Sequence, residues 1–276
     1  MPDQLQLRGG TTSEHSSFTG AAREVTVDTT KKTLVVHDGS QAGGTPLMRE
    51  SGGGVNATIN SVNIGKGANS VAGNTVLGET ALDAAVTGGN NTAIGNSALT
   101  ALTSGTQNTA IGSASSDAIT TGSSNTAVGR LSLSSNISGN QNTAIGKQAL
   151  EDNTGSNNTA VGDRAGSENI SGTQNTFVGA VSGKANTTAS NNAGLGFNSL
   201  VSNTTGARNT AVGAFALDAN TTASRNDAFG FNALTGNTTG TENVALGDSA
   251  MALNTTGQHN VAVGTSALNA NTTASN

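Results

Sequence analysis

The chain has 276 residues and a formal net charge of −5, contains no cysteine, tryptophan or tyrosine, and is charged at only 11% of its residues. This composition excludes disulfide scaffolds and thiolate chemistry, and it lacks the basic surface and stacking rings expected of a nucleic-acid-binding protein. Six phenylalanines are the only aromatic residues, so any hydrophobic core must be thin.

Charged residues divide the chain into two regions. Residues 1–50 hold 11 of the 29 charged residues (12 basic and 17 acidic), and the remaining 226 residues hold eighteen. Glycine, serine and proline cluster at 39–46 and again at 51–54, which is typical of loops and linkers. We therefore predict an N-terminal β domain over residues 1–50, a Gly-rich linker over 51–59 and a repeat region over 60–276.

The N-terminal region contains a candidate β-hairpin. Residues 24–28 and 33–37 are rich in β-branched residues and are separated by Thr29, Thr30, Lys31 and Lys32. An isolated hairpin is only marginally stable in water. We therefore expect a partner chain or a larger assembly to cover it.

An asparagine recurs every seventeen residues from Asn74 to the end of the chain, with one sixteen-residue unit at 142–157. A glycine follows each asparagine four residues later, from Gly78 to Gly264. A looser version, Asn60 to Gly65, precedes the first unit. Taking the asparagine as position 1, the twelve units begin at residues 74, 91, 108, 125, 142, 158, 175, 192, 209, 226, 243 and 260.

Two positions of each unit carry large apolar residues. Position 4 is always large and apolar, and position 9 is usually leucine, with interruptions at Ser116, Gly166 and Gly183. Position 8 is always alanine or serine. Strand alternation then predicts buried ladders at positions 4 and 9, opposite small-residue faces at positions 3 and 8.

These repeats predict an all-β chain in which about twelve 17-residue coils form a β-solenoid behind the small N-terminal β domain. A helix is unsuitable because glycine and clustered threonines leave no sustained 3.6-residue apolar stripe. Asparagine at position 12, from Asn136 onward, can stack its amides from coil to coil. Two large apolar residues per coil bury little surface, so we expect further burial between chains at the small-residue faces.

Residues suited to catalysis or metal binding are sparse. His15, His37 and His259 have no metal-ligand spacing and no neighbouring nucleophile motif. Gly52–Gly54 and Gly65–Gly67 lack the Gly-Lys-Ser/Thr ending of a phosphate-binding loop. Residues 151–158 are rich in oxygen donors but coincide with the shortened unit, which favours a tightened turn. We predict no catalytic, cofactor-binding or metal residue and no enzyme activity.

Two segments resemble known families. Asn91-Thr-Ala-Ile-Gly95 and Asn260-Val-Ala-Val-Gly264 resemble the head repeats of trimeric autotransporter adhesins, and this resemblance implies a β-roll that assembles as a homotrimer. The opening run from Leu5 to Gly39 is similar to the N-terminal domain of bacteriophage tail fibres and tropism determinants. That resemblance implies attachment to a phage tail or baseplate protein through residues 1–50, location in the virion, and a host receptor bound by a distal region.

The chain shows no basic segment followed by an apolar run at its start and no stretch of about 20 apolar residues, so we expect assembly in the host cytoplasm and no membrane insertion. Two alternatives stay open. The repeats themselves could act as a receptor-binding adhesin, or paired threonines such as Thr204 and Thr205 could form an ice-binding surface array.

Overall fold

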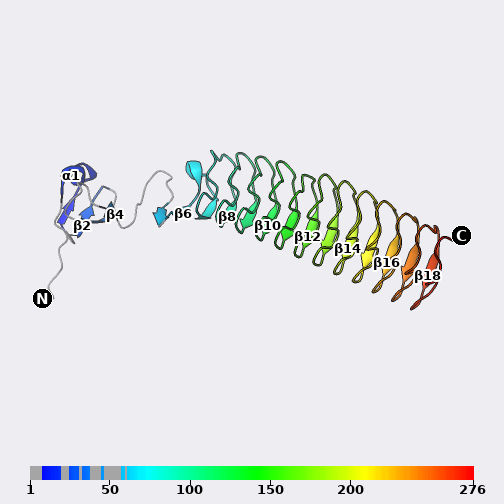
Figure 1. The fold of residues 1–276 in the computed structure, drawn as a ribbon. Coiled ribbons are helices and arrows are strands. Elements are labelled where there is room, and N and C mark those ends of the chain that lie inside the picture. Colours follow the sequence, from blue (N-terminus) through cyan, green and yellow to red (C-terminus); the bar gives the residue numbers. More distant parts are fainter. Residues whose placement is uncertain (1–7, 20–24, 31–32, 38–44, 47–56, 60) are drawn as a thin grey trace. The chain divides into compact units, whose positions relative to one another are not determined.

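The computed structural model describes residues 8–19, 25–30, 33–37, 45–46, 57–59 and 61–276. It divides the chain into two compact units, Met1–Ala57 and Thr58–Asn276 (Figure 1). Residues 51–56 of the predicted linker lie outside the described residues.

In the residues that the structure describes, the first unit is a four-stranded sheet with one short helix. Strand β1 (Arg8–Gly10) pairs in parallel with β2 (Val25–Asp28), β2 pairs antiparallel with β3 (Thr33–Val36), and β3 pairs antiparallel with β4 (Thr45–Pro46). The predicted hairpin is therefore confirmed as β2 and β3. Between β1 and β2 lies helix α1 (Thr12–Ser17).

Helix α1 begins with a capping box. The Glu14 amide donates to Thr11 Oγ1 at 3.3 Å, and the Thr11 amide donates to Glu14 Oε2 at 2.6 Å. This reciprocal pair satisfies amides that have no partner inside the helix, which explains how a helix of six residues begins at a fixed point.

The centre of the first unit contains a buried histidine. His37 is 1% exposed, its Nε2 lies 2.9 Å from Thr26 Oγ1, and the Phe18 ring packs edge-on against it with ring centroids 5.2 Å apart. Val35 is also buried. Strands β1 and β4 and the Phe18 ring therefore supply part of the cover that we expected a partner chain to supply.

The second unit is a β-solenoid with one short strand per coil (Figure 1). Strands β7 to β18 pair in parallel in chain order, and each residue pairs with its equivalent in the next coil, as Thr126 does with Thr143. The prediction of an all-β chain with a seventeen-residue solenoid repeat is confirmed. The strands are β7 (Thr75–Gly78), β8 (Thr92–Ile94), β9 (Thr109–Ile111), β10 (Thr126–Val128), β11 (Thr143–Ile145), β12 (Thr159–Val161), β13 (Thr176–Val178), β14 (Ala193–Leu195), β15 (Thr210–Val212), β16 (Asp227–Phe229), β17 (Val244–Leu246) and β18 (Val261–Val263).

The looser unit before Asn74 does not form another coil of the same kind. Strand β6 (Val62–Gly65) pairs antiparallel with β7, β5 (Ala57–Ile59) lies beyond β6 in the sheet, and a short 3-10 helix covers Ala68–Ser70. The edge of β7 is therefore paired, and the sheet ends at β5.

The solenoid interior contradicts the expected ladder at position 4. The side chains at position 3 are buried instead, and the large residues at position 4 point outward with half-exposed side chains. Position 9 is buried as predicted, from Leu82 to Met251. The inner residues at position 3 are Val76, Ala93, Ala110, Ala127, Ala144, Ala160, Phe177, Gly194, Ala211, Ala228, Ala245 and Ala262.

The predicted small-residue face at position 8 is also interior. Ala98 and Leu99, at positions 8 and 9 of one coil, are both fully buried. Positions 7 and 9 take left-handed backbone angles, with φ of 58° at Ser97 and 51° at Leu99. Strand alternation does not apply to such a turn, so neighbouring side chains can both enter the core, and the small residues are not available for contact between chains.

The narrow interior explains two of the three interruptions of the ladder at position 9, the glycines at 166 and 183. Phe177 occupies position 3 of its coil and is fully buried. A Cβ on Gly183 would collide with the Phe177 ring, and a Cβ on Gly166 would lie 2.9 Å from it. The glycines at position 9 in these two coils therefore make room for one large residue at position 3.

Buried asparagines join each coil to the next. The amide nitrogen of Asn175 donates to Asn158 Oδ1 at 3.0 Å, Asn175 Nδ2 donates to the Ala189 carbonyl at 2.8 Å, and Asn175 Oδ1 accepts the Asn192 amide at 3.0 Å. The same pattern recurs at position 1 of the other coils. Each asparagine thus connects the start of its coil to the coil's own end and to both neighbours.

A second asparagine ladder occupies position 12, as predicted. Asn203 Nδ2 donates to Asn186 Oδ1 at 3.1 Å, and Asn220 Nδ2 donates to Asn203 Oδ1 at 2.8 Å. Coils that begin at Asn91 and Asn108 instead place Leu102 and Ile119 there, and both are fully buried. The interior therefore accepts either apolar packing or stacked amides at this corner.

We expect Asn175→Ala to lower the free energy of unfolding because it leaves the buried Asn192 amide without its acceptor. The cost of such a group is about 1–3 kcal/mol. Urea unfolding followed by circular dichroism measures the change, and Thr188→Ala, at an exposed turn position, is the matched control. Equal unfolding midpoints for the two variants would contradict the role assigned to the position 1 ladder.

Phe177→Ala and Gly183→Leu should compensate each other. Phe177→Ala alone leaves a cavity that costs about 3–5 kcal/mol, and Gly183→Leu alone collides with the ring. Together they restore the alanine and leucine found in other coils, where leucine already adopts the required positive φ, as at Leu200 (52°). A double-mutant cycle measured by urea unfolding should give a favourable coupling energy, whereas simple additivity would contradict the shared-volume explanation.

Candidate functional surfaces

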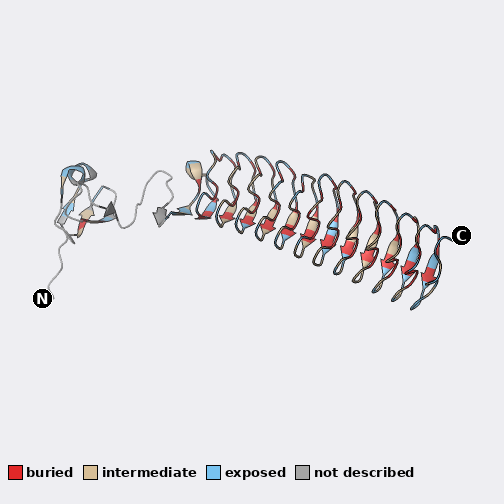
Figure 2. Ribbon diagram, viewed as in Figure 1, coloured by how far each residue is buried: buried red, intermediate tan, exposed pale blue. Residues whose placement is uncertain are grey.

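The outward face of the solenoid sheet carries a continuous row of large apolar residues. We call this row the strand-face ladder and define it as the twelve residues at position 4. Figure 2 shows buried residues in red within the strands, between neighbours that are less buried. The most exposed members, between 37% and 66%, are Leu77, Ile111, Ile145, Val178, Leu195, Phe229, Leu246 and Val263.

The dimensions of this face indicate an interaction surface. Three residues per strand span about 10 Å, and twelve strands at about 4.8 Å spacing span about 55 Å. The resulting stripe of roughly 550 Å² combines the ladder with the partly exposed threonines at position 2. The largest apolar patch on a typical monomeric protein covers about 300–600 Å² and is often functional, so the ladder is a candidate contact between chains.

The threonine pairs form a second repeating surface. The first threonine of each pair donates its hydroxyl to the next coil, as Thr204 Oγ1 does to the Thr221 carbonyl at 3.0 Å and Thr221 Oγ1 does to the Thr238 carbonyl at 3.3 Å. The second threonine, such as Thr205, is exposed. Only the second threonine of each pair thus has a hydroxyl proton free to donate to a ligand. These second threonines form a row one residue wide along the solenoid.

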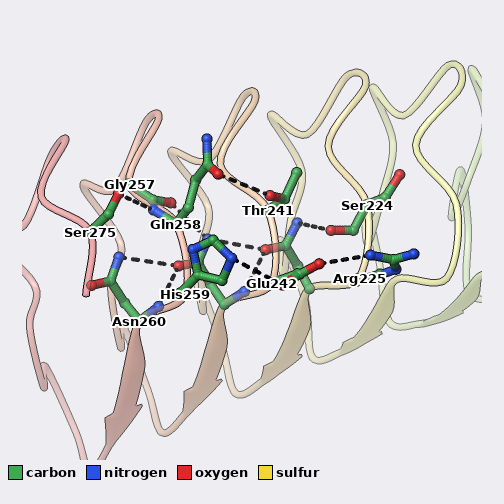
Figure 3. A network of polar contacts seen from close by, with 11 residues as sticks. Ser224, Arg225, Thr241, Glu242, Gly257, Gln258, His259, Asn260 and Ser275 are labelled. Carbon is green, nitrogen blue, oxygen red and sulfur yellow. Dashed lines mark hydrogen bonds and ion pairs between the residues drawn. The ribbon is translucent and has the colours of Figure 1, made fainter.

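A polar network links three coils at position 17, close to the amino ends of the strands (Figure 3). Arg225 Nη1 lies 2.7 Å from Glu242 Oε1, and His259 Nε2 lies 3.1 Å from Glu242 Oε2. The hydrogen bond from Arg225 is the main cause that lowers the pKa of Glu242, and the charges of His259 and Arg225 add to it, against a weaker opposing effect of desolvation. The Glu242 carboxylate therefore bridges two basic side chains.

The structure separates the three histidines considered in the sequence. His37 is buried in the first unit, the His15 backbone lies in α1, and His259 is exposed beside Glu242. In the described residues, no group of three or more His, Cys, Asp or Glu side chains could hold a metal ion. No described helix is long and apolar enough to cross a membrane.

The oxygen-rich segment 151–158 is a compact turn. Asn153 Nδ2 donates to the Gly155 carbonyl at 2.9 Å, and Asn158 Nδ2 donates to Asn153 Oδ1 at 3.0 Å. Glu151 Oε2 accepts a hydrogen bond from Gln148 Nε2 at 2.7 Å. These contacts direct the donors and acceptors of the segment toward the chain itself.

Comparisons with known proteins concern a limited part of the chain. Residues 5–41 match the model of the family described as the major tropism determinant N-terminal domain. Over 49 residues, 18% of the chain, the sequence is 65% identical to the tail fiber receptor-binding protein of Bordetella phage BPP-1, of which the match covers 13%. The solved structure titled Major Tropism Determinant U1 Variant is 47% identical over 22% of this chain and 19% of that chain, with a TM-score of 0.16.

These matches confirm the resemblance of the opening segment to the N-terminal domains of phage tail fibres and tropism determinants. The chain spans only about an eighth of the curated relative's length. The strand-face ladder and the position 17 network lie outside the family match at residues 5–41. Strand alternation missed the outward direction of the ladder because it ignored the turns that follow each strand.

We expect the Glu242 carboxyl to titrate below its usual pKa. Because the folded-state pKa is lowered, the stabilising contribution is present above the unfolded-state value and is lost as the pH falls through the folded-state value. Carbon-13 NMR of the glutamate side chains measures the titration, and Arg225→Gln should raise the Glu242 pKa. Arg208→Gln, one coil earlier at the same position, is the control and should leave it unchanged.

Proposed function

We propose that this chain is a non-enzymatic structural component of a bacteriophage tail fibre, in which the N-terminal unit attaches to the tail or baseplate and the solenoid forms the shaft. The observation that supports this most directly is the tropism-determinant type of N-terminal domain on the same chain as a regular solenoid with an exposed apolar face. On this proposal the protein resides in the virion and assembles in the host cytoplasm.

The N-terminal unit is suited to attachment because it is small and separately packed. Its sheet has its own buried centre at Thr26, Val35 and His37. The matched relative is named a tail fiber receptor-binding protein, and the match covers 13% of it. We propose that the shared domain performs the attachment and that the receptor is contacted by a region distal to it.

Several copies of the solenoid are proposed to pack side by side through the strand-face ladder, as a homotrimer. Ile111, Ile145 and Leu246 cannot enter the interior of their own coils, which positions 3 and 9 already fill. Removing the ladder from water stabilises the assembly by about 25 cal/mol for each Å² of apolar surface. A threefold rotation axis parallel to the rod keeps equivalent coils at the same level in every copy. Each coil then packs against the same coil of the neighbouring copy.

Attachment can be tested on particles made by the strain that encodes the chain. Gold-labelled antibodies raised against the solenoid should mark one end of tailed particles in electron micrographs. Particles made with a chain that lacks residues 1–57 should carry no label, because the attaching unit is absent. Label spread over the host cell surface, with none on particles, would favour the adhesin alternative.

We expect light scattering of the purified chain to give three times the single-chain mass of 26.9 kDa. Ile111→Lys combined with Ile145→Lys should reduce it to the single-chain mass, because equal charges then meet at the same level in every copy. Ile137→Lys combined with Ile170→Lys, at exposed turn positions, is the control and should keep the mass. A folded wild-type chain of single-chain mass would contradict the assembly.

A further inference from the structure

Half of the chain's six phenylalanines gather at one edge of the solenoid sheet. Phe197 and Phe231 directly follow Gly196 and Gly230, the glycines that come next after β14 and β16, and Phe215 lies between them after β15. The Phe215 ring packs edge-on against both, with ring centroids 5.4 Å from Phe197 and 5.9 Å from Phe231. Phe197 and Phe231 remain 49% and 48% exposed. We call these three residues the aromatic edge.

The aromatic edge widens the strand-face ladder in one part of the rod only. Phe229 belongs to the ladder and stands two residues before Phe231, so the two surfaces are continuous. In the coils that begin at residues 74, 125, 142 and 158 the same edge, at positions 6 and 7, carries charged residues, which include Glu79, Arg130, Lys147 and Asp163. In the coils that begin at residues 175 to 226 it carries none.

The opposite edge of the sheet carries two arginines at matching levels. Arg208 immediately precedes the unit that contains β15. Arg225, which is labelled in Figure 3, precedes the unit that contains β16. Arg225 contacts Glu242. Arg208 is exposed, and the described residues offer its side chain no ion-pair or hydrogen-bond partner. A guanidinium group stacks favourably on an aromatic ring.

Symmetry brings these two edges together. A rotation axis parallel to the rod places the carboxyl edge of one copy's sheet beside the amino edge of the next copy's sheet, at the same coil level. The aromatic edge of one copy then lies level with Arg208 and Arg225 of the next. Any other parallel side-by-side packing of equivalent faces breaks the cyclic symmetry.

We propose that the aromatic edge is a lock between copies of this chain, in which Phe197, Phe215 and Phe231 of one copy pack against the Arg208 and Arg225 edge of the next. The inference rests on the side-by-side assembly proposed above and assigns its register. The lock fixes which coils stand level, because a shift by several coils would set the rings against polar residues such as Asn157 or Asn90.

Disulfide cross-linking tests the lock cleanly because the natural chain contains no cysteine. Phe231→Cys with Arg225→Cys places two thiols at the level of β16, roughly 15–20 Å apart within one chain and so beyond the 7 Å that a disulfide spans. Oxidation should join copies into a covalent trimer on a non-reducing gel. Phe231→Cys with Asn90→Cys, about 38 Å out of level, is the control and should form no cross-link.

A second measurement separates the lock from the assembly itself. Phe197→Ser with Phe231→Ser should keep the circular dichroism spectrum, because both rings are half exposed, and should raise the dissociation constant about tenfold to a hundredfold. Ile137→Ser with Ile170→Ser is the control. If the double serine variant dissociates like the wild type and the Phe231→Cys with Arg225→Cys variant forms no cross-link, the lock is overturned. A wild-type trimer in the same experiment would still support the side-by-side assembly. Cross-linking by the mismatched pair would overturn the register.

Discussion

The buried asparagine at position 1 is the interaction on which the rest of the solenoid depends. Each side chain satisfies the amide of the next coil's asparagine and donates to the carbonyl that ends its own coil, as Asn175 does with Asn192 and Ala189. Because both contacts are buried, losing either leaves a polar group without water. The asparagine therefore fixes the position of each coil on the previous one, at a spacing of seventeen residues in all but one unit, and the sixteen-residue unit that begins at Asn142 keeps both contacts.

This spacing leaves an interior that holds few large side chains. Gly112, at position 5, shows how closely the coils approach, because a Cβ there would lie 2.5 Å from the Gly129 carbonyl oxygen at a φ of 139° that favours glycine. Position 3 is alanine in most coils where position 9 is leucine, and the Phe177 coil reverses the balance with glycines at 166 and 183. Close packing of this kind makes volume at one position a constraint on the others.

The same lack of space directs the large residues at position 4 outward. A chain with so few aromatic and aliphatic residues leaves many of its largest ones half exposed, as at Leu195 and Leu246. The surface that results is long, regular and apolar, which suits packing against identical rods far better than binding a small ligand. The surfaces that this fold presents are therefore repeated ones, with the aromatic edge and the Arg225–Glu242–His259 network as local departures from the repeat.

The sequence by itself determined the fold class, the repeat length, the buried ladder at position 9 and the stacked amides at position 12, because these follow from periodicity and from the chemistry of asparagine and leucine. It also identified the hairpin and the similarity of residues 5–39 to phage N-terminal domains. Only the tertiary structure decided which side of the strand faces inward. That choice depends on left-handed turns at residues such as Ser97 and Leu99, which strand alternation does not represent. It also depends on the small interior volume that remains beside the buried leucine at position 9. The stacking of successive coils also brought Phe197, Phe215 and Phe231 together from three separate coils.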